Sequence, residues 1–373
     1  MSAVQATHSD QPIRVGLAGI GNWAVHGHVR VLKMLPQYRL RALWSTRPDA
    51  AQKAAATHGI EEVVESLDAL VNHPEVDLVV VLNTAPQHAQ TVRKAIAAGK
   101  HVYCEWPLTV STQDSLELVE LASRAGVRHV VGLQRRLAPH NRYLRDLVQS
   151  GFVGKIRSVR IHVSMNGFGP ERSQVLRWTV PAENFSSAIA IYAGHFLDML
   201  FTAVGWPERI SALALNQIKT VTIRETGEVL PSSAPDQLML IGRMADDAVV
   251  AVHVEAGKRN GRGVRIDITG DAGDLRITNA SAFGDVGDDY VIEGAQGKDM
   301  PMQKLDIPLQ YDRLPASDLP SAVLELAELY AAYADDLRTG SSDAPTFADA
   351  VRLHRLIDAA MHSTEEGREI TLT

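Results

Sequence analysis

The chain has 373 residues, 45% of them hydrophobic and 22% charged, and its 37 Lys and Arg against 44 Asp and Glu leave a formal charge of −7. That length predicts about two domains of ordinary globular composition, and the net negative charge argues against nucleic-acid binding, which needs concentrated Lys and Arg. The only cysteine, Cys104, excludes disulfides within the chain and zinc sites made of several cysteines. No apolar run reaches the roughly 20 residues that cross a membrane, and the polar residues 1–12 carry no apolar signal segment. We therefore expect a cytoplasmic protein with a disordered leader over residues 1–12 and no membrane contact.

Short apolar runs alternate with stretches of helical spacing from residue 13 to residue 133. The runs predict strands at residues 13–18, 39–44, 77–82, 101–104 and 127–133. The stretches between them predict helices at residues 25–35, 48–58, 87–98 and 111–125. Strands that alternate with helices of this length predict right-handed βαβ units and a doubly wound parallel sheet.

The pattern changes near Gly151, where apolar and polar residues begin to alternate as on half-exposed antiparallel strands. Such strands are predicted at residues 156–164, 209–215, 237–244, 248–255 and 264–269. Residues 220–235 and 281–305 contain Gly, Asp and Pro and are predicted to be surface loops, whereas residues 317–362 return to helical spacing. We therefore expect one domain over residues 13–150 and a second over residues 151–373, with the C-terminal helices packing back on the first.

A glycine-rich motif, Gly19-Ile20-Gly21-Asn22-Trp23-Ala24, lies between the first predicted strand and the first predicted helix. In this context Gly19 permits a tight turn, Gly21 lets the backbone approach a pyrophosphate, and Ala24 keeps helix and strand close. The alternative is a simple strand–helix turn. The motif predicts dinucleotide binding through Gly19, Gly21, Asn22 and Trp23.

The end of the second predicted strand indicates which dinucleotide is bound. An acidic residue there would bind the ribose 2′-hydroxyl of NAD. The chain instead reads Ser45-Thr46-Arg47, and Asp49 follows only after a proline. Hydroxyl groups and a guanidinium suit a 2′-phosphate, so NADP is favoured and NAD stays open; the alternative for Arg47 is a solvated loop residue.

Several further motifs together resemble one known family. They are Thr84-Ala85-Pro86-Gln87-His88, Ala98-Gly99-Lys100-His101-Val102, Cys104-Glu105-Trp106-Pro107-Leu108, Gly194-His195-Phe196-Leu197-Asp198 and Ser363-Thr364-Glu365-Glu366-Gly367-Arg368. With the glycine motif they resemble the glucose–fructose oxidoreductase / inositol dehydrogenase (Gfo/Idh/MocA) family over nearly the whole chain. The resemblance implies an N-terminal Rossmann domain and a C-terminal domain with an open, predominantly antiparallel sheet, through which members form homodimers or homotetramers. It also implies hydride transfer between NAD(P) and a sugar, cyclitol or similar polyhydroxylated substrate.

The chain departs from the family at two charged positions. The family's Glu-Lys-Pro motif is here Glu105-Trp106-Pro107, and the family's aspartate four residues before the histidine is here Ile191. Only His195 remains of the usual Lys–Asp–His group. The altered motif resembles the branch that contains the fungal galactose-regulon repressor, which binds NADP as a regulator.

His195 is the main candidate for catalysis, because a neutral imidazole can accept the hydroxyl proton during hydride removal. Asp198, three residues later on the same helical face, could orient the imidazole, and Tyr192 could donate a hydrogen bond. Each has a structural alternative: a hydrogen-bonded core histidine, a first-turn aspartate and a packed tyrosine.

The remaining candidates concern binding. The resemblance implies cofactor contacts for Thr84, Pro86, His88, Glu105 and Pro107, with Glu105 on the nicotinamide ribose, and a substrate position for Arg177 and Trp178. Trp106 offers a flat surface for a nicotinamide or sugar ring, or simple core packing. Arg135 could face the cofactor and Arg136 an oxygen-rich substrate, unless both are solvated. No metal site is expected, since His26 and His28 point to different faces of a helix.

Two functions remain at this stage. The first is an NADP-dependent oxidoreductase acting on a carbohydrate-like alcohol or ketone, with His195 as acid–base group. The second is a non-catalytic NADP-binding regulator that acts through a protein partner, suggested by Trp106 and Ile191.

Overall fold

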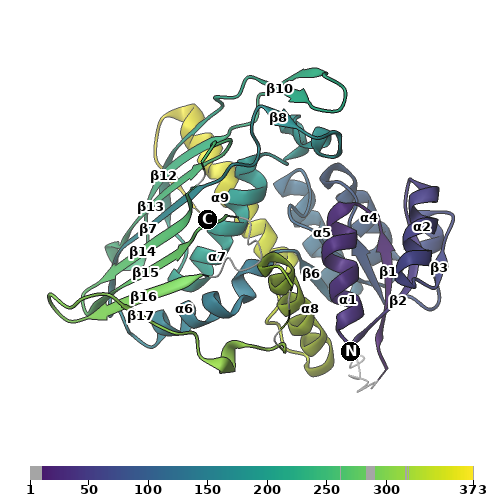
Figure 1. Ribbon diagram of the computed structural model, residues 1–373, viewed down its shortest axis with the longest axis horizontal. Coiled ribbons are helices and arrows are strands. Elements are labelled where there is room, and N and C mark those ends of the chain that lie inside the picture. The colour runs from purple at the N-terminus through teal and green to yellow at the C-terminus, as the bar shows by residue number, and fades with distance from the viewer. Residues whose placement is uncertain (1–10, 261, 283–289, 316, 318, 373) are drawn as a thin grey trace. The chain divides into compact units, whose positions relative to one another are not determined.

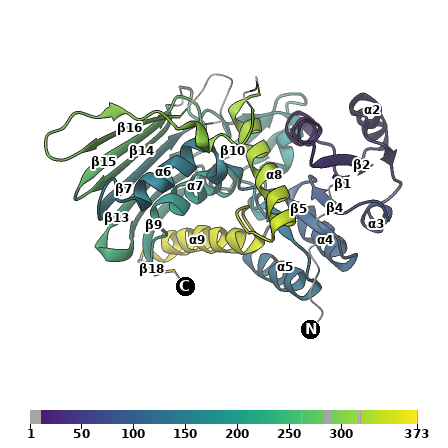
Figure 2. The ribbon, with the colours of Figure 1, turned by 90° about the horizontal axis from the view of Figure 1, so that it is seen from below.

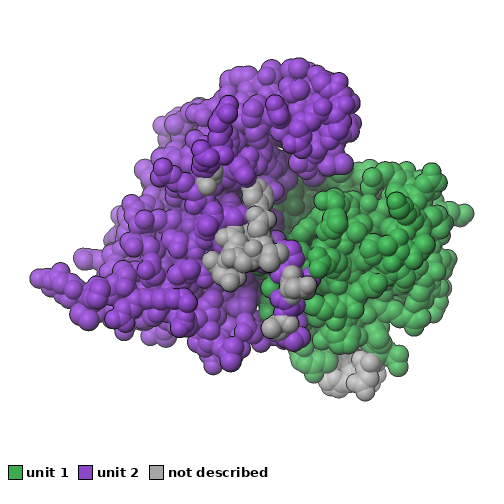
Figure 3. Space-filling view, in the orientation of Figure 1, with its two compact units in different colours: residues 1–134, 323–351 green, residues 135–322, 352–373 purple. Residues whose placement is uncertain are grey.

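A computed structural model describes residues 11–260, 262–282, 290–315, 317 and 319–372. The chain divides into two compact units (Figure 3): unit 1 is Met1–Gln134 with Val323–Val351, and unit 2 is Arg135–Ala322 with Arg352–Thr373. This division falls at residue 134, and the domain boundary near residue 150 stays a prediction. Residues 1–10 of the predicted leader lie outside the described residues.

Unit 1 contains a six-stranded parallel sheet with the order β3-β2-β1-β4-β5-β6 (Figure 1). Its strands are β1 (Ile13–Ala18), β2 (Tyr38–Trp44), β3 (Glu62–Val63), β4 (Leu78–Val81), β5 (His101–Cys104) and β6 (His129–Val131). All four residues of β4 are buried, as expected for a central strand covered on both faces. The strand order reverses between β1 and β4, which is where doubly wound sheets bind ligands at their carboxyl edge. The predicted doubly wound sheet is confirmed.

The helices of unit 1 follow the predicted alternation. They are a π-helix η1 (Ala24–Val29) continued by α1 (Arg30–Met34), then α2 (Pro48–His58), α3 (Leu67–Val71), α4 (Ala85–Ala97), α5 (Thr112–Ala125) and α8 (Ser321–Thr339). The Ser111 side chain accepts a hydrogen bond from the Asp114 N–H to begin α5, and Gly126, left-handed at a φ of +66°, ends it.

The helical region predicted over residues 317–362 contains two helices, α8 and α9 (Phe347–Glu366). Gly340 has a φ of +79° and ends α8, and Pro345 follows shortly after. The Asp336 carboxylate accepts hydrogen bonds from the Ser341 hydroxyl at 2.6 Å and from the Ala344 N–H at 2.9 Å, which fixes the turn. This local capping places the break between the two C-terminal helices, whose position the periodic pattern alone did not predict.

Unit 2 is built on a nine-stranded sheet with the order β17-β16-β15-β14-β7-β13-β12-β9-β18. Its strands are β7 (Ile156–Ser164), β9 (Arg209–Leu215), β12 (Gln237–Arg243), β13 (Val249–Glu255), β14 (Gly263–Gly270), β15 (Gly273–Asn279), β16 (Val291–Gln296), β17 (Gln303–Lys304) and β18 (Ile370–Thr371). Neighbouring strands are antiparallel except β7 and β13, which are parallel. The expected, predominantly antiparallel sheet is confirmed.

The two predicted loops contain strands. Residues 220–235 hold β10 (Thr220–Ile223) and β11 (Val229–Pro231), which form a small sheet with β8 (Glu171–Arg172), and residues 281–305 hold β16 and β17. Val221 and Ile223 of β10 are fully buried and alternate with threonines. This short alternation of β-branched residues is the sequence signal of the strand, and the neighbouring turn residues obscure it. The loop predictions were therefore wrong.

Helices cover one face of the nine-stranded sheet. These are α6 (Pro139–Gln149), α7 (Gly194–Val204) and residues 352–366 of α9 (Figures 1 and 2). Ser363 and Thr364 of α9 accept hydrogen bonds from backbone N–H groups of β9. The segment Ala182–Val204 is long and apolar enough to cross a membrane, but 72% of its most apolar window is buried inside the protein, so we assign it to the core of a globular protein.

Short helical turns connect the longer elements. They are η2 (Gln134–Leu137), η3 (Gln174–Thr179), η4 (Ala182–Asn184), the π-helix η5 (Ile189–Ala193), η6 (Ala245–Asp247) and η7 (Leu309–Tyr311). The π-helix η5 runs directly into α7 and carries Tyr192 just before His195.

Candidate functional site

The glycine loop has the backbone that its motif predicts. Gly19 has a φ of +118°, and a Cβ there would lie 2.8 Å from the Asn83 backbone nitrogen, so only glycine fits. A Cβ on Gly21, by contrast, would meet no atom within 4 Å. The open side of Gly21 lets a pyrophosphate approach the backbone, and Ala24, 2% exposed, keeps the first helix against the sheet. The loop therefore fits a dinucleotide, while the cofactor roles of the exposed Asn22 and of Trp23 stay predictions.

Arg47 lies against this loop. Its guanidinium donates a hydrogen bond to the Ile20 carbonyl at 2.8 Å, and its backbone N–H donates to the Ser45 hydroxyl at 3.2 Å. Asp49 lies in the first turn of α2 and is exposed. The carboxyl end of β2 thus presents a cation and the hydroxyls of Ser45 and Thr46 beside the glycine loop.

The Glu105 carboxylate follows β5 and is held by buried donors. Its Oε1 accepts a hydrogen bond from the Tyr103 hydroxyl at 2.7 Å and lies 3.0 Å from His28 Nε2, and His28 Nδ1 lies 2.7 Å from the Tyr330 hydroxyl. Because an ionised carboxylate can only accept, we assign the imidazole proton to Nε2, which leaves Nδ1 to accept from Tyr330.

Burial makes this arrangement rigid. His28, Tyr103 and Tyr330 are fully buried, and the two tyrosine rings stack with centroids 5.0 Å apart. Burial raises the pKa of both phenols well above 10, so they remain hydrogen-bond donors. The Glu105 side chain keeps 18% exposure, so its carboxylate is held in place while part of it stays accessible. The cofactor role of Glu105 stays a prediction.

Gly132, just after β6, makes room for that carboxylate. A Cβ at this position would lie 2.8 Å from the Tyr103 hydroxyl oxygen and 2.9 Å from Glu105 Oε1. Sequence reasoning missed this glycine and the three residues that hold Glu105. Of these residues, the sequence singled out only His28, as part of the pair His26 and His28. The two histidines were predicted to lie on different faces of the helix, and His28 is buried whereas His26 is exposed.

The other motif residues of unit 1 divide into an edge group and a core group. Thr84 precedes α4 and Pro86 lies in its first turn, both at the carboxyl end of β4. His88 is 2% exposed, and its ring nitrogens lie 2.8 Å from the Pro107 carbonyl and 3.0 Å from the Asn83 carbonyl. Burial lowers its pKa, against the opposing effect of these carbonyls.

Two residues of this group are buried. Both nitrogens of His88 face backbone carbonyls, so its side chain positions the turn at Pro107. Trp106 is 4% exposed, which favours the core-packing alternative for its indole. The cofactor roles of His88 and Trp106 stay predictions. The cofactor roles of Thr84, Pro86 and Pro107 stay predictions.

The predicted catalytic residues lie in unit 2, where η5 meets α7. His195 is half-buried in the first turn of α7, and the half-buried Tyr192 precedes it by three residues. The Tyr192 ring packs edge-on against Phe168, with centroids 5.2 Å apart. Burial raises the pKa of Tyr192 to about 12, against the opposing charge of Arg135, so the phenol stays protonated at neutral pH.

Asp198 and Arg136 form a buried ion pair. Arg136 Nε donates to Asp198 Oδ2 at 2.8 Å, and Nη2 contacts Oδ1, a two-pronged geometry. The Asp198 side chain is 1% exposed and the Arg136 side chain 11% exposed. Arg136 is thus the ion-pair partner of Asp198, and its substrate role stays a prediction. The proposed orientation of His195 by Asp198 stays a prediction.

Two further arginines also have partners within unit 2. Arg135 is 6% exposed; its guanidinium donates to the Ala282 carbonyl at 3.1 Å and lies 4.6 Å from the centre of the Phe196 ring. Arg177 is exposed and forms a two-pronged ion pair with Glu228 at 2.7 and 3.0 Å. The cofactor role of Arg135 and the substrate roles of Arg177 and the half-buried Trp178 stay predictions.

Two family models match the chain. Residues 13–133 match an oxidoreductase family with an NAD-binding Rossmann fold, and residues 139–279 match the C-terminal domain of Gal80p. The first match confirms an NAD(P)-binding Rossmann domain, and together they confirm the predicted resemblance.

Similar proteins include a regulator and dehydrogenases. The galactose/lactose metabolism regulatory protein GAL80 of Saccharomyces cerevisiae is 22% identical over 426 aligned positions, covering 100% of this chain and 97% of that protein. The scyllo-inositol 2-dehydrogenase (NADP(+)) IolW of Bacillus subtilis is 23% identical over 368 residues, covering 96% of both chains. A solved structure of levoglucosan dehydrogenase with NADH and levoglucosan shares the fold, with a TM-score of 0.86 at 20% identity over 97% of this chain and 100% of that one.

Proposed function

Since the chain belongs to the Gfo/Idh/MocA family and joins its Rossmann domain to a Gal80p-like C-terminal domain, we propose that it is an oxidoreductase. The reaction is hydride transfer between NADP and a hydroxyl- or carbonyl-bearing carbon of a sugar, cyclitol or similar polyhydroxylated molecule. The observation that carries this proposal is the Glu105 carboxylate, fixed by Tyr103 and His28 at the carboxyl edge of the Rossmann sheet. A carboxylate held in one orientation suits the binding of a ribose hydroxyl.

The chain's own residues have separate tasks in this reaction. The nicotinamide, when bound, supplies the carbon that accepts or donates hydride. Glu105 orients the ribose next to it, and His195 accepts the proton of the substrate hydroxyl during oxidation and returns it during reduction. Tyr192, protonated because burial raises its pKa to about 12, donates a hydrogen bond to the substrate oxygen.

The preference for NADP rests on Arg47 and Ser45. The hydrogen bond from Arg47 to the Ile20 carbonyl holds the guanidinium beside the glycine loop, where a 2′-phosphate would accept charge-assisted hydrogen bonds. No carboxylate at the end of β2 competes for the ribose 2′-hydroxyl.

Steady-state kinetics of His195→Ala test the acid–base assignment. We expect NADPH formation from an accepted sugar or cyclitol to fall by about 100-fold or more, while His26→Ala, which removes an exposed histidine, retains wild-type turnover. Turnover that survives intact in the His195 variant would remove the proposed mechanism.

A second candidate function is a non-catalytic NADP-binding regulator that acts through a protein partner. Two observations favour it: Trp106 and Ile191 replace the charged groups of the usual catalytic set, and residues 139–279 match the Gal80p domain. This function predicts NADP binding without turnover across a broad sugar and cyclitol panel. Measured hydride transfer would exclude its strict form.

We also propose that the open face of the nine-stranded sheet joins copies of the chain into a homodimer or homotetramer. The face exposes Leu213 and Leu215 on β9 and Met239 and Ile241 on β12, more apolar side chain than a solvated sheet face needs. Sedimentation of Ile241→Arg should show a shift to monomers. An unchanged assembly would place the contact elsewhere.

A further inference from the structure

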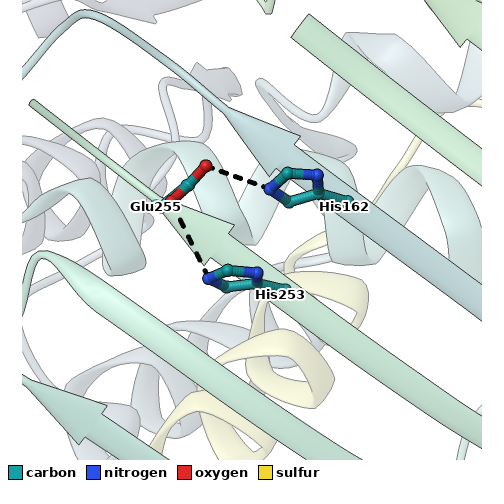
Figure 4. A group of neighbouring side chains, drawn as sticks. All are labelled: His162, His253 and Glu255. Carbon is teal, nitrogen blue, oxygen red and sulfur yellow. Dashed lines mark hydrogen bonds and ion pairs between the residues drawn. The ribbon is translucent and has the colours of Figure 1, made fainter. Parts of the chain in front are cut away.

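Three side chains of types that can bind a metal ion meet on the open face of the nine-stranded sheet. They are His162 on β7 and His253 and Glu255 on β13 (Figure 4). The parallel register pairs His253 with His162, and Glu255 shares their face because it lies two residues after His253. The pairing of the strands therefore brings His253 and Glu255 of β13 close to His162 of β7.

The three groups already point toward one another. The imidazole rings stack with centroids 4.8 Å apart and planes inclined by 17°, and both present Nε2 to the same carboxylate (Figure 4). His162 Nε2 lies 3.1 Å from Glu255 Oε1, and His253 Nε2 lies 4.0 Å from Oε2. Donor atoms around a tetrahedral zinc ion are about 3.3 Å apart, given bonds near 2.0–2.1 Å. Small side-chain rotations would bring these atoms to that spacing.

The donor set selects the class of metal. Two imidazole nitrogens and one carboxylate oxygen suit zinc and similar transition-metal ions, whereas calcium and magnesium prefer oxygen ligands alone. All three side chains are partly exposed in a single chain, so an ion can reach them before copies of the chain associate through this face. We propose that His162, His253 and Glu255 form a binding site for one zinc-class divalent ion per chain, with a ligand from outside the chain completing the coordination.

Lys258 acts as a competing cation at this site. Its ammonium lies 2.8 Å from Glu255 Oε2, where it offsets the carboxylate charge. Arg265, which is paired in register with His162, donates both prongs of its guanidinium to Asp267, and Arg160 lies 3.1 Å from the same carboxylate. These two arginines are therefore engaged with Asp267, and a metal ion would compete for Glu255 with Lys258 and with the Ser164 hydroxyl.

Competition for zinc against a chromogenic chelator, with the full-length protein, tests the site. We expect one equivalent of bound zinc, at least about tenfold weaker binding in His253→Ala and in Glu255→Gln, and severalfold tighter binding in Lys258→Met. His73→Ala is the matched control, because it removes another His–Glu pair, with Glu62 at 3.2 Å, that has no second histidine. Its zinc binding should equal that of the wild type.

Cobalt substitution provides a second readout that does not depend on affinity. Bound Co²⁺ should give the visible absorption of a tetrahedral nitrogen–oxygen site, and Glu255→Gln should abolish it while the circular dichroism of the fold is retained. The proposal is overturned if the wild type takes up less than one equivalent of zinc. It is equally overturned if the His253 and Glu255 variants bind zinc as tightly as His73→Ala.

Discussion

Replacing Arg47 by alanine separates the two nicotinamide cofactors. The Arg47 guanidinium is fixed beside the glycine loop by its 2.8 Å hydrogen bond to the Ile20 carbonyl, so it loses little freedom when it meets a 2′-phosphate. A hydrogen bond between charged groups contributes about 1.5–3 kcal/mol, and the lower value applies here because Arg47 is exposed to water. About 1.5 kcal/mol corresponds to roughly tenfold in affinity. We therefore expect NADPH to bind about tenfold more weakly to Arg47→Ala, with NADH affected by less than about twofold.

Fluorescence titration with both cofactors measures this difference. Because only NADPH carries the 2′-phosphate, NADH reports any general damage to the glycine loop. Arg39→Ala, which removes another exposed arginine from β2, should leave the ratio of the two affinities unchanged. Added salt should weaken NADPH binding to the wild type more than to Arg47→Ala. Equal losses for both cofactors, or no loss for NADPH, would refute the assignment of Arg47 to the phosphate.

Three further substitutions test other parts of the account. In Gly132→Ala the added methyl collides with the Glu105 carboxylate, so we expect a loss of about 1–3 kcal/mol in unfolding free energy and weaker NADPH binding; wild-type values for both would contradict the packing described. Burial lowers the pKa of His129 to about 4. When the pH is lowered from about 6.5 to 5, this imidazole is protonated in the unfolded chain but stays neutral in the folded chain, so the free energy of unfolding decreases. The wild type should lose about 2 kcal/mol more over that interval than His129→Gln in urea denaturation, and parallel curves would show that His129 titrates normally. Arg136→Met leaves the buried Asp198 charge without this ion pair and should destabilise the protein by about 3–5 kcal/mol, whereas a loss below about 1 kcal/mol would mean that Asp198 is neutral or solvated.

The sequence predicted those elements whose pattern is long and regular. β7 and β9 have the predicted bounds: apolar residues recur at every second position from Val159 to Val163 in β7, and β9 carries an apolar run over residues 212–215. The sequence predicted loops at β10 and β16 because each strand has only four to six residues and is flanked by Gly, Asp and Pro. So short an alternating segment cannot be distinguished from a turn. The break between α8 and α9 depends on the capping carboxylate of Asp336, which ordinary helical spacing does not reveal.

The site was predictable only where its chemistry is local in sequence. The glycine loop and Arg47 are adjacent to single strands, so motif and context were sufficient. The hydrogen bond between His28 and Tyr330 joins residues 302 positions apart, and no spacing rule in one sequence connects them. Likewise, the sequence predicted a substrate role for Arg136 and an imidazole-orienting role for Asp198, because a sequence shows a charge but not the opposite charge that tertiary packing brings to it.

Transfer of deuterium from NADPH labelled at its transferable position is the most direct test of the proposed function. Wild-type protein is mixed with the labelled cofactor and a panel of ketoses, inososes and other cyclic polyhydroxy ketones, and the products are examined by mass spectrometry. The account predicts that at least one ketone becomes an alcohol carrying a single carbon-bound deuterium, and that His195→Ala forms this product at least about 100-fold more slowly. Tight NADPH binding with no deuterium in any product would contradict the oxidoreductase assignment and leave the NADP-binding regulator as the function of this chain.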